Sequence, residues 1–467
     1  MENKLSRCIS MCRIFILLFV AIPLGGRAQT LNIYDAVNKT IANYPLLQQR
    51  QAEVSAGKAH LTAVNGNRLP SLILQDQVSM GTDNSLQGAY FSLGIVPSTP
   101  GSYSNVQSSP NAGNVAISFL KWEFYTFGYY NAQHKEAKSQ LAVSEANLNS
   151  DKYQLTENIV SLYLDWLKKY RLLQIQNENM LRSQVIFTAI RATVLSGLKP
   201  GVDSSTASAA YADARISYLQ ALDNYNYDRI AVGTYAGIYS PEIVPDTSII
   251  TPSLLQNMAF VQQVDSVISS HPILEVYHKQ YEQQLAANNT ISKEYLPRFG
   301  IDGAAWSRNS GISYNGAYPG DLADGMPYNR SNYLFGLSLT YNIFDLKHRH
   351  DALAEGKYRA DATQSAMQMQ QLNLNTMLQQ ANSTYASTVE KLKEIPVQLY
   401  SAQQAYGQQL ALYRSGLNTL IDVTNAQYVL LQAETSYVNM QDELLQLLYI
   451  RAGLGGQLDN FLQKFKR

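Results

Sequence analysis

Cysteine is almost absent from this 467-residue sequence, and its two cysteines, Cys8 and Cys12, both lie near the N-terminus. The residues around them have the pattern of a secretory signal peptide: basic residues precede an apolar run over 14–24, and the small residues Gly26 and Ala28 follow it. We therefore predict a signal peptide over residues 1–28, cleaved after Ala28. The mature chain would then contain no thiol, which excludes disulfides, cysteine metal sites and a cysteine nucleophile.

Charge and long apolar runs are also scarce. Charged residues make up 15% of the sequence, and 36 basic residues balance 36 acidic ones, so a basic nucleic-acid-binding surface is not expected. No segment after the predicted signal peptide has 18 consecutive apolar residues, so no membrane-spanning helix is predicted. If an exported chain of this kind enters a bilayer, it must do so through paired β-strands.

The common catalytic motifs are missing. The sequence has no H-E-x-x-H, G-x-S-x-G, Walker A or G-x-G-x-x-G pattern. Among the six histidines, His348 and His350 would lie on the same face of a strand, but with no third ligand near them we expect a solvated position and not a metal site. We predict that the protein is not an enzyme and uses no cofactor.

The sequence contains an internal duplication. The segments 43–45 and 68–70 recur 227 positions later, at 270–272 and 295–297, whereas Ser196-Gly197-Leu198 recurs 219 positions later as Ser415-Gly416-Leu417. The two offsets differ because the segment between the matched stretches is longer in one repeat than in the other. Such a change in length is tolerated most easily in a surface loop. We predict a first structural repeat over 29–240 and a second over 241–467, each containing a helix, two strands, a long helix and a return helix.

Two strands are expected in each repeat. Residues 81–113 and 307–332 are rich in Gly, Ser, Asn and Pro and are predicted to be loops. Residues 333–343 alternate between bulky apolar and mostly small or polar side chains, the period of a strand; 115–119 alternate similarly, and 72–80 and 299–305 are weaker partners. Aromatic residues at the strand ends are typical of a membrane interface, and an ordinary half-buried hairpin is the alternative.

Long helices follow the strands. Residues 129–195 contain neither Gly nor Pro, which predicts a helix of about 100 Å at 1.5 Å per residue. Apolar or aromatic residues recur every seven positions, typical of packed, supercoiled helices: Ile159, Trp166, Leu173, Met180, Phe187 and Val194, and Leu378, Tyr385, Leu392, Leu399, Tyr406 and Tyr413 in the second repeat. A second seam is interrupted by Lys169, Gln176 and Ser183, so we expect that face to be wet, as in the wall of a hollow helical tube. A solid coiled coil is the alternative.

Glycine is expected to end both long helices, at Gly197 and Gly416. Shorter helices then return over about 203–231 and 422–452. Pro396 lies inside the second long helix and should bend it.

The segment from Tyr413 to Val423 reads YRSGLNTLIDV, and Asn425-Ala426-Gln427 follows it. With this segment and the duplicated order of elements, nearly the whole mature chain resembles the TolC-like outer-membrane efflux family. The resemblance implies an α+β membrane protein that assembles as a homotrimer. Four strands per chain would contribute to a 12-stranded β-barrel in the outer membrane, and the long coiled-coil helices would form a periplasmic α-barrel.

The resemblance also implies a function and partners. The chain would be the passive exit duct of a tripartite efflux or type I secretion system, with a periplasmic adaptor protein, an inner-membrane pump and outer-membrane lipids as partners. A structural periplasmic coiled-coil protein without a pore is the alternative, which the strands in both repeats disfavour. Among export ducts, a duct dedicated to protein secretion is a further alternative.

Two sets of site residues follow from the resemblance. The turns Gly197-Leu198 and Gly416-Leu417 correspond to the family's adaptor-contacting turns, and their alternative role is a plain helix cap.

The second set is a periplasmic gate formed by Asp203, Tyr413 and Asp422. In the family, the matching tyrosine and an arginine bind the carboxylate at the position of Asp203. Asn418 stands here in place of that arginine, and Asn425 in place of a second carboxylate, so a weaker lock is expected. The alternative is that each aspartate only begins or caps its helix, a role less typical of Asp422, which follows Leu420-Ile421.

Overall fold

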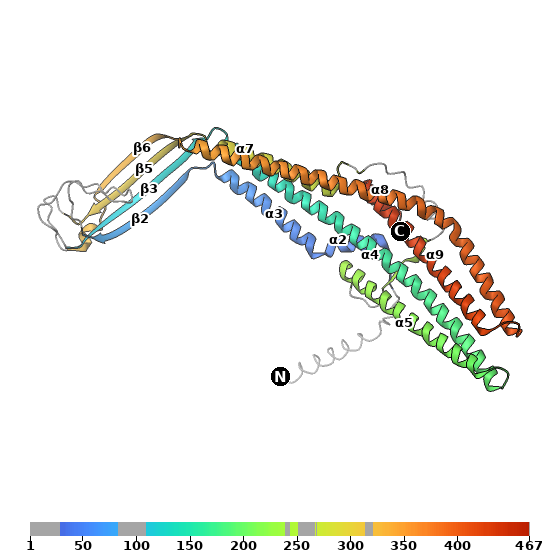
Figure 1. Ribbon diagram of the computed structural model, residues 1–467. Coiled ribbons are helices and arrows are strands. Elements are labelled where there is room, and N and C mark those ends of the chain that lie inside the picture. The colour runs from blue at the N-terminus through green and yellow to red at the C-terminus, as the bar shows by residue number, and fades with distance from the viewer. Residues whose placement is uncertain are drawn as a thin grey trace, which may run out of the picture. The chain divides into compact units, whose positions relative to one another are not determined.

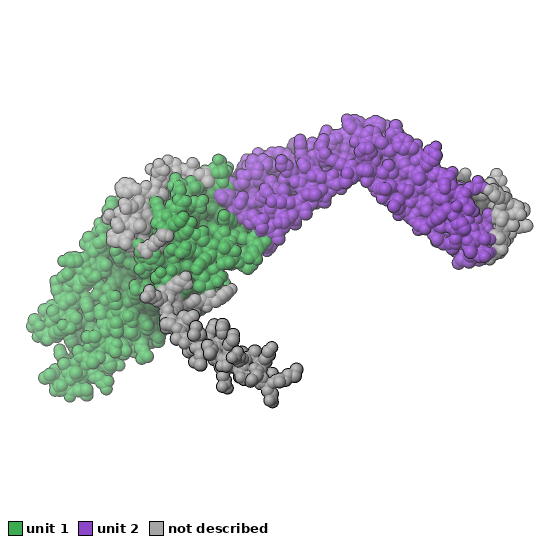
Figure 2. Space-filling view, turned by 180° about the vertical axis from the view of Figure 1, so that it is seen from behind, with its two compact units in different colours: residues 1–48, 150–271, 371–467 green, residues 49–149, 272–370 purple. Residues whose placement is uncertain are grey.

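A computed structural model of the chain describes residues 29–82, 109–238, 243–250, 267, 269–312 and 321–466 (Figure 1). The predicted signal peptide and most of the first predicted loop lie outside these residues. The chain divides into two compact units, coloured separately in Figure 2, and each unit takes residues from both halves of the sequence. Unit 1 comprises residues 1–48, 150–271 and 371–467, and unit 2 comprises residues 49–149 and 272–370.

The elements of the first half of the chain are β1 (Gln29–Leu31), α2 (Ile33–Asn43), α3 (Pro45–Gly66), β2 (Ser71–Gly81), β3 (Asn111–Tyr125), α4 (Tyr129–Leu195) and α5 (Gly201–Ala236). The second half contains β4 (Ile243–Pro245), the 3-10 helix η1 (Thr247–Ile250), α7 (Pro272–Glu294), β5 (Arg298–Ser310), the 3-10 helix η2 (Leu322–Gly325), β6 (Arg330–Thr340), α8 (Asp345–Arg414), α9 (Leu420–Leu454) and α10 (Leu458–Gln463). The order α3-β2-β3-α4-α5 therefore recurs as α7-β5-β6-α8-α9.

Unit 2 contains one antiparallel sheet with the strand order β2-β3-β5-β6. Its two central strands come from different repeats, and their pairing places Ile117 opposite Trp306. All four predicted strands are confirmed: β2, β3 and β5 are longer than expected, whereas β6 has the expected 11 residues but begins and ends three residues earlier. Strand β3 already begins at Asn111, and β5 continues to Ser310, so the two predicted loops are shorter at their described ends. The polar residues there continue the strands because backbone pairing does not depend on apolar side chains.

Helices in unit 2 pack in pairs on the side of the sheet where α4 and α8 begin. Arg68, just after α3, donates a hydrogen bond from Nη2 to Asn131 Oδ1 of α4 over 2.9 Å. Arg349 of α8 donates from Nε to the carbonyl oxygen of Ser292 in α7 over 3.2 Å. These contacts join the helix before each hairpin to the helix after it.

The first long helix has the predicted length, and the second is of similar length. Helix α4 has 67 residues and α8 has 70, and Pro396 lies within α8 without ending it. The absence of Gly and Pro from α4 explains its continuity, since these residues most strongly disfavour a helix interior. Within the described residues, no helix combines the length and the apolar character needed to cross a membrane.

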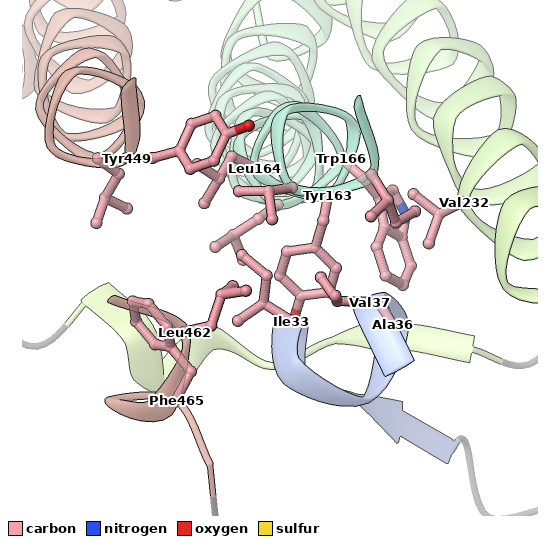
Figure 3. Close-up of a cluster of buried hydrophobic side chains, with 14 of the residues drawn as sticks. Ile33, Ala36, Val37, Tyr163, Leu164, Trp166, Val232, Tyr449, Leu462 and Phe465 are labelled. Carbon is pink, nitrogen blue, oxygen red and sulfur yellow. The ribbon is translucent and has the colours of Figure 1, made fainter. Parts of the chain in front are cut away.

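The main core of unit 1 surrounds the middle of α4, where Tyr163 and Trp166 are fully buried (Figure 3). Strands β1 and β4 form a short parallel pair beside this core. Tyr163 donates a hydrogen bond from Oη to the carbonyl oxygen of Leu31 over 2.7 Å and accepts one from the backbone N–H of Asp246 over 3.0 Å. A single buried tyrosine thus binds the loop after β4 and strand β1 to α4.

The heptad positions pack as predicted. Ile159, Trp166 and Leu378 are buried, and most of the others join apolar clusters: Leu173, Tyr385 and Leu392 the main core, Phe187, Val194 and Tyr413 a second cluster, and Leu399 and Tyr406 a third. The heptad rows of both repeats therefore contribute to helix packing in unit 1.

The predicted wet seam is wrong at two of its positions. Lys169 Nζ lies 2.7 Å from Oδ2 of Asp228, a residue of α5 that is almost completely buried. Ser183 is buried and accepts a hydrogen bond from Gln427 of α9 over 2.7 Å. Polar residues interrupt this seam because they bind neighbouring helices, since a polar group can be buried when its hydrogen bonds are satisfied.

Candidate functional site

The two turns at the ends of α4 and α8 have the same backbone geometry. Gly197 and Gly416 adopt φ angles of 73° and 76°, in the left-handed region that favours glycine. The N–H of each glycine donates to the carbonyl three residues before it, and the N–H of the following leucine donates to the carbonyl five residues before it, all over 3.0 Å. This is the Schellman motif, so the predicted glycine ends of both helices are confirmed.

The leucines after these glycines do not pack within the chain. A Schellman motif is frequently accompanied by an apolar contact between the residue after the glycine and the last helical turn. Leu198 and Leu417 instead have exposed fractions of 75% and 74%. Each turn therefore presents an apolar side chain that the chain itself does not cover.

An apolar cluster behind the turns joins all four helices that end or begin there. Ile190 of α4, Ala207 of α5 and Leu420 of α9 are buried in it, and Tyr413 of α8 packs against them. The structure thus brings together the two Ser-Gly-Leu turns, which are 219 positions apart in the sequence.

Tyr413 and Asp203, two of the predicted gate residues, are close enough to interact electrostatically. Burial raises the pKa of the Tyr413 phenol above its usual value, and the negative charge of Asp203 raises it further. The hydroxyl of Tyr413 is buried and has no hydrogen-bond partner among the described residues. Lys199, in the turn between α4 and α5, places Nζ 4.7 Å from the centre of the Tyr413 ring.

Asp422 is a capping residue, contrary to the prediction that it is the less cap-like of the two aspartates. Its Oδ2 accepts hydrogen bonds from the Thr419 hydroxyl over 2.6 Å and from the Thr419 N–H over 2.9 Å. The N–H of Asp422 donates in turn to Thr419 Oγ1, which completes a capping box. Two hydrogen bonds lower the pKa of Asp422: the one from the Thr419 hydroxyl has the larger effect, and the one from the Thr419 N–H the smaller. The Thr-x-x-Asp spacing in the sequence was the available signal.

Asp203, unlike Asp422, makes no capping hydrogen bond. It lies in the first turn of α5, whose N-cap is Pro200, and no side-chain hydrogen bond caps that helix. Asn418, at the position of the family's arginine, binds the side chain of Gln409 instead of reaching Asp203. Asn425 is exposed on α9.

The sheet of unit 2 has an exposed apolar face. Residues directly opposite each other in antiparallel strands share a face, and the register places large apolar residues of both edge strands on the same one. They are Leu72, Leu74, Val78 and Met80 of β2 and Tyr333, Phe335, Leu337 and Leu339 of β6, all more than half exposed. Asp76 interrupts this face on β2.

Aromatic residues cluster where the strands meet the long helices. The rings of Tyr125 and Phe127 lie 4.8 Å apart edge to face, and Phe299 of β5 lies 6.2 Å from each of them. Trp122 donates from Nε1 to the carbonyl oxygen of Arg68 over 3.1 Å. Phe127 was not predicted to belong to this cluster, and it adopts a positive φ of 49°.

His348 and His350 do not lie on a strand. Both belong to the first turns of α8, where residues two positions apart point to different sides of the helix, so the expected shared face is wrong. Among the described residues, no group of three or more His, Cys, Asp or Glu side chains is arranged to hold a metal ion.

A family model described as "Outer membrane efflux protein" matches residues 36–237 and 264–449, most of the described chain. The chain belongs to this outer membrane efflux protein family. As a member, the protein is an outer membrane efflux protein. No curated protein matches the chain.

Several solved members of this kind share the fold. The CmeC outer membrane channel of Campylobacter jejuni has a TM-score of 0.72 and 14% identity, over 93% of this chain and 89% of that one. The outer membrane protein VceC of Vibrio cholerae has a TM-score of 0.70 and 14% identity, over 91% and 96%. The Neisseria gonorrhoeae MtrE channel in its open state has a TM-score of 0.67 and 15% identity, over 91% and 89%.

Proposed function

We propose that this outer membrane efflux family member is the passive exit duct of a tripartite efflux or type I secretion system and works as a homotrimer. The observation that carries the proposal is the four-stranded sheet, whose two edge strands pair with no further strand among the described residues. Strand β2 is exposed along all 11 residues, and β6 is exposed along most of its length. Long exposed edge strands template further pairing, so a stable protein must pair or cover them.

Pairing β6 of one chain with β2 of the next satisfies both edges. Three chains would close a barrel of 12 strands, above the minimum of about eight for membrane barrels. The exposed leucines, Phe335 and Tyr333 would then face lipid, and the aromatic cluster around Tyr125 would lie at the periplasmic interface of the membrane. The two sequence repeats, 29–240 and 241–467, would each supply one hairpin per chain.

The helical segments would continue the duct as a periplasmic tunnel. Their ends carry the exposed Leu198 and Leu417, which we assign as contacts for the helical hairpins of a periplasmic adaptor protein. An apolar side chain beside a helix cap fits between two partner helices. The adaptor in turn would connect the duct to an inner-membrane pump that supplies the energy of transport.

The same end would hold the gate. Asp203, Tyr413 and Asp422 of three chains would gather six carboxylates near one axis, favouring cations over anions at the mouth. Tyr413 and Asp203 already interact within one chain. Asp422 would contribute a fixed charge, because its carboxylate is held by Thr419.

The proposal is tested by fractionation and by mass measurement in detergent. We expect heat-modifiable trimers in the outer membrane and ion conductance in planar bilayers. Recovery of a soluble periplasmic protein without conductance would favour a structural coiled-coil protein and reject the duct. A stable monomer with full β content would reject the closure of the sheet by three chains.

A further inference from the structure

Lys199 lies on the turn of the first repeat and contacts a ring of the second repeat. Its Nζ is 4.7 Å from the centre of the Tyr413 ring, within the range of a cation–π contact. The two residues are 214 positions apart in the sequence but belong to the same unit. Pro200 follows Lys199, and a residue before proline is restricted to extended backbone conformations. The position of the lysine is therefore limited by the turn itself.

The face of the Tyr413 ring is engaged, whereas its hydroxyl is not. Tyr413 Oη is buried without a hydrogen-bond partner among the described residues, although Asp203 is near enough to influence its ionisation. Asn418 cannot supply a cation, and its amide is bound to Gln409. The α4–α5 turn is thus joined to α8 through a lysine on an aromatic face.

We propose that Lys199 is the cation of the gate and holds the α4–α5 turn against α8 through the ring of Tyr413. The inference rests on the proposed gate and adds a residue and a type of contact to it. When α5 moves away from the axis, the ammonium group must leave the ring, so this contact opposes opening. Asp203, four residues after Lys199, lies in the first turn of α5 and moves with that helix.

The Lys199–Tyr413 contact should change the ratio of closed to open channels modestly for one chain and more strongly for a trimer. A cation–π contact at a partly exposed site corresponds to roughly a threefold change in an equilibrium constant. Three such contacts that break together would multiply to roughly thirtyfold in the ratio of closed to open channels. An effect of this size is measurable as resting conductance.

Four single variants distinguish the role of the Tyr413 ring from that of its hydroxyl, and the role of the Lys199 charge from that of its side-chain length. Lys199→Met removes the charge, and Lys199→Arg keeps it. Tyr413→Leu removes the ring, and Tyr413→Phe keeps it without the hydroxyl. Each variant is purified as the full-length channel, checked for trimers on gels and measured for resting conductance in planar bilayers, together with the Lys199→Met/Tyr413→Leu double variant and Asp203→Ala.

We expect Lys199→Met and Tyr413→Leu to raise resting conductance roughly thirtyfold, the double variant to add nothing further, and Lys199→Arg and Tyr413→Phe to conduct like wild type. If Tyr413→Phe opens the channel as Tyr413→Leu does, the hydroxyl holds the gate and the inference is overturned. Wild-type conductance of Lys199→Met, while Asp203→Ala opens the channel, would overturn only the lysine contact. A channel already open, with no variant changing it, would overturn the proposed gate itself.

Discussion

Lys168 of α4 and Asp442 of α9 form an ion pair in which Nζ lies 2.9 Å from Oδ2, although 274 positions separate them. Only 11% of the Asp442 side chain is exposed, and Lys168 also contacts Asp165 of its own helix over 3.0 Å. Burial raises the pKa of the Asp442 carboxyl despite the attraction of Lys168. The pair is thus a desolvated contact between a helix of the first repeat and a helix of the second.

Removing the cation from this pair should destabilise the protein. Lys168→Met leaves the buried Asp442 carboxylate without its nearest positive charge, and we expect a loss of about 3 kcal/mol at neutral pH. Because Lys168 no longer lowers it, the folded pKa of Asp442 rises further, so the loss should be present above that pKa and shrink as the pH falls through it. Thermal denaturation in detergent between pH 7 and pH 4 measures both effects. Lys393→Met removes an exposed pair with Glu390 and should change the midpoint little.

Gly233 in α5 should not tolerate alanine. A Cβ at this position would lie 2.6 Å from the carbonyl oxygen of Ile238, which is backbone and cannot turn away. We expect Gly233→Ala to cost about 2 kcal/mol. Gly407 in α8 is the matched control, because its Cβ would meet nothing within 4 Å, and alanine there should stabilise the helix by about 1 kcal/mol. Equal melting temperatures for the two variants would contradict this account.

The capping box predicts an acid-dependent contribution of Asp422. Thr419 lowers the folded pKa of Asp422, so the stabilisation is present above the ordinary aspartate value and is lost as the pH falls through the folded pKa. We expect Asp422→Asn to lower the melting temperature at pH 7 and to approach wild type near pH 3. A difference that is the same at both pH values would show that the carboxylate charge has no capping role.

Charge at the two exposed leucines should block partner contact without affecting assembly. Leu198→Asp with Leu417→Asp places carboxylates where an apolar contact is proposed, and we expect export to be lost while trimers still form. Cross-linking to the adaptor and an export assay in cells measure this. The paired Leu→Met variant keeps the apolar character and should export normally. Unchanged export by the aspartate variant would place the adaptor contact elsewhere.

The sequence was most informative where a pattern is long. Helix α4 has the predicted bounds, since no Gly or Pro interrupts its 67 residues, and both glycine ends were found because Ser-Gly-Leu occurs twice. The contacts of Lys169 and Lys199 were not predicted. Each contact depends on a residue far away in the sequence, Asp228 for Lys169 and Tyr413 for Lys199. A local sequence pattern does not show which distant side chain the fold will bring next to a lysine.

Short elements were missed for a different reason. Strands β1 and β4 have three residues each, too few for a period of two to be recognised, yet they pair beside the main core. The capping role of Asp422 was not predicted because the apolar residues just before it do not indicate a helix start, whereas Thr419, three positions earlier, forms the cap. For Asp203 the preceding Pro-Gly indicated a helix start correctly but did not show whether its carboxylate caps the helix.

The different starts of the two return helices make the duplicated halves mechanically unequal. Helix α9 is held at its first turn by the reciprocal hydrogen bonds of Thr419 and Asp422, whereas the N-cap of α5, Pro200, makes no side-chain capping bond. A missing cap is worth about 1 kcal/mol, so the first turn of α5 should fray more often and exchange its amide protons faster. The two halves of the duplicated chain therefore differ in local stability at these helix starts, and the first half is the looser one.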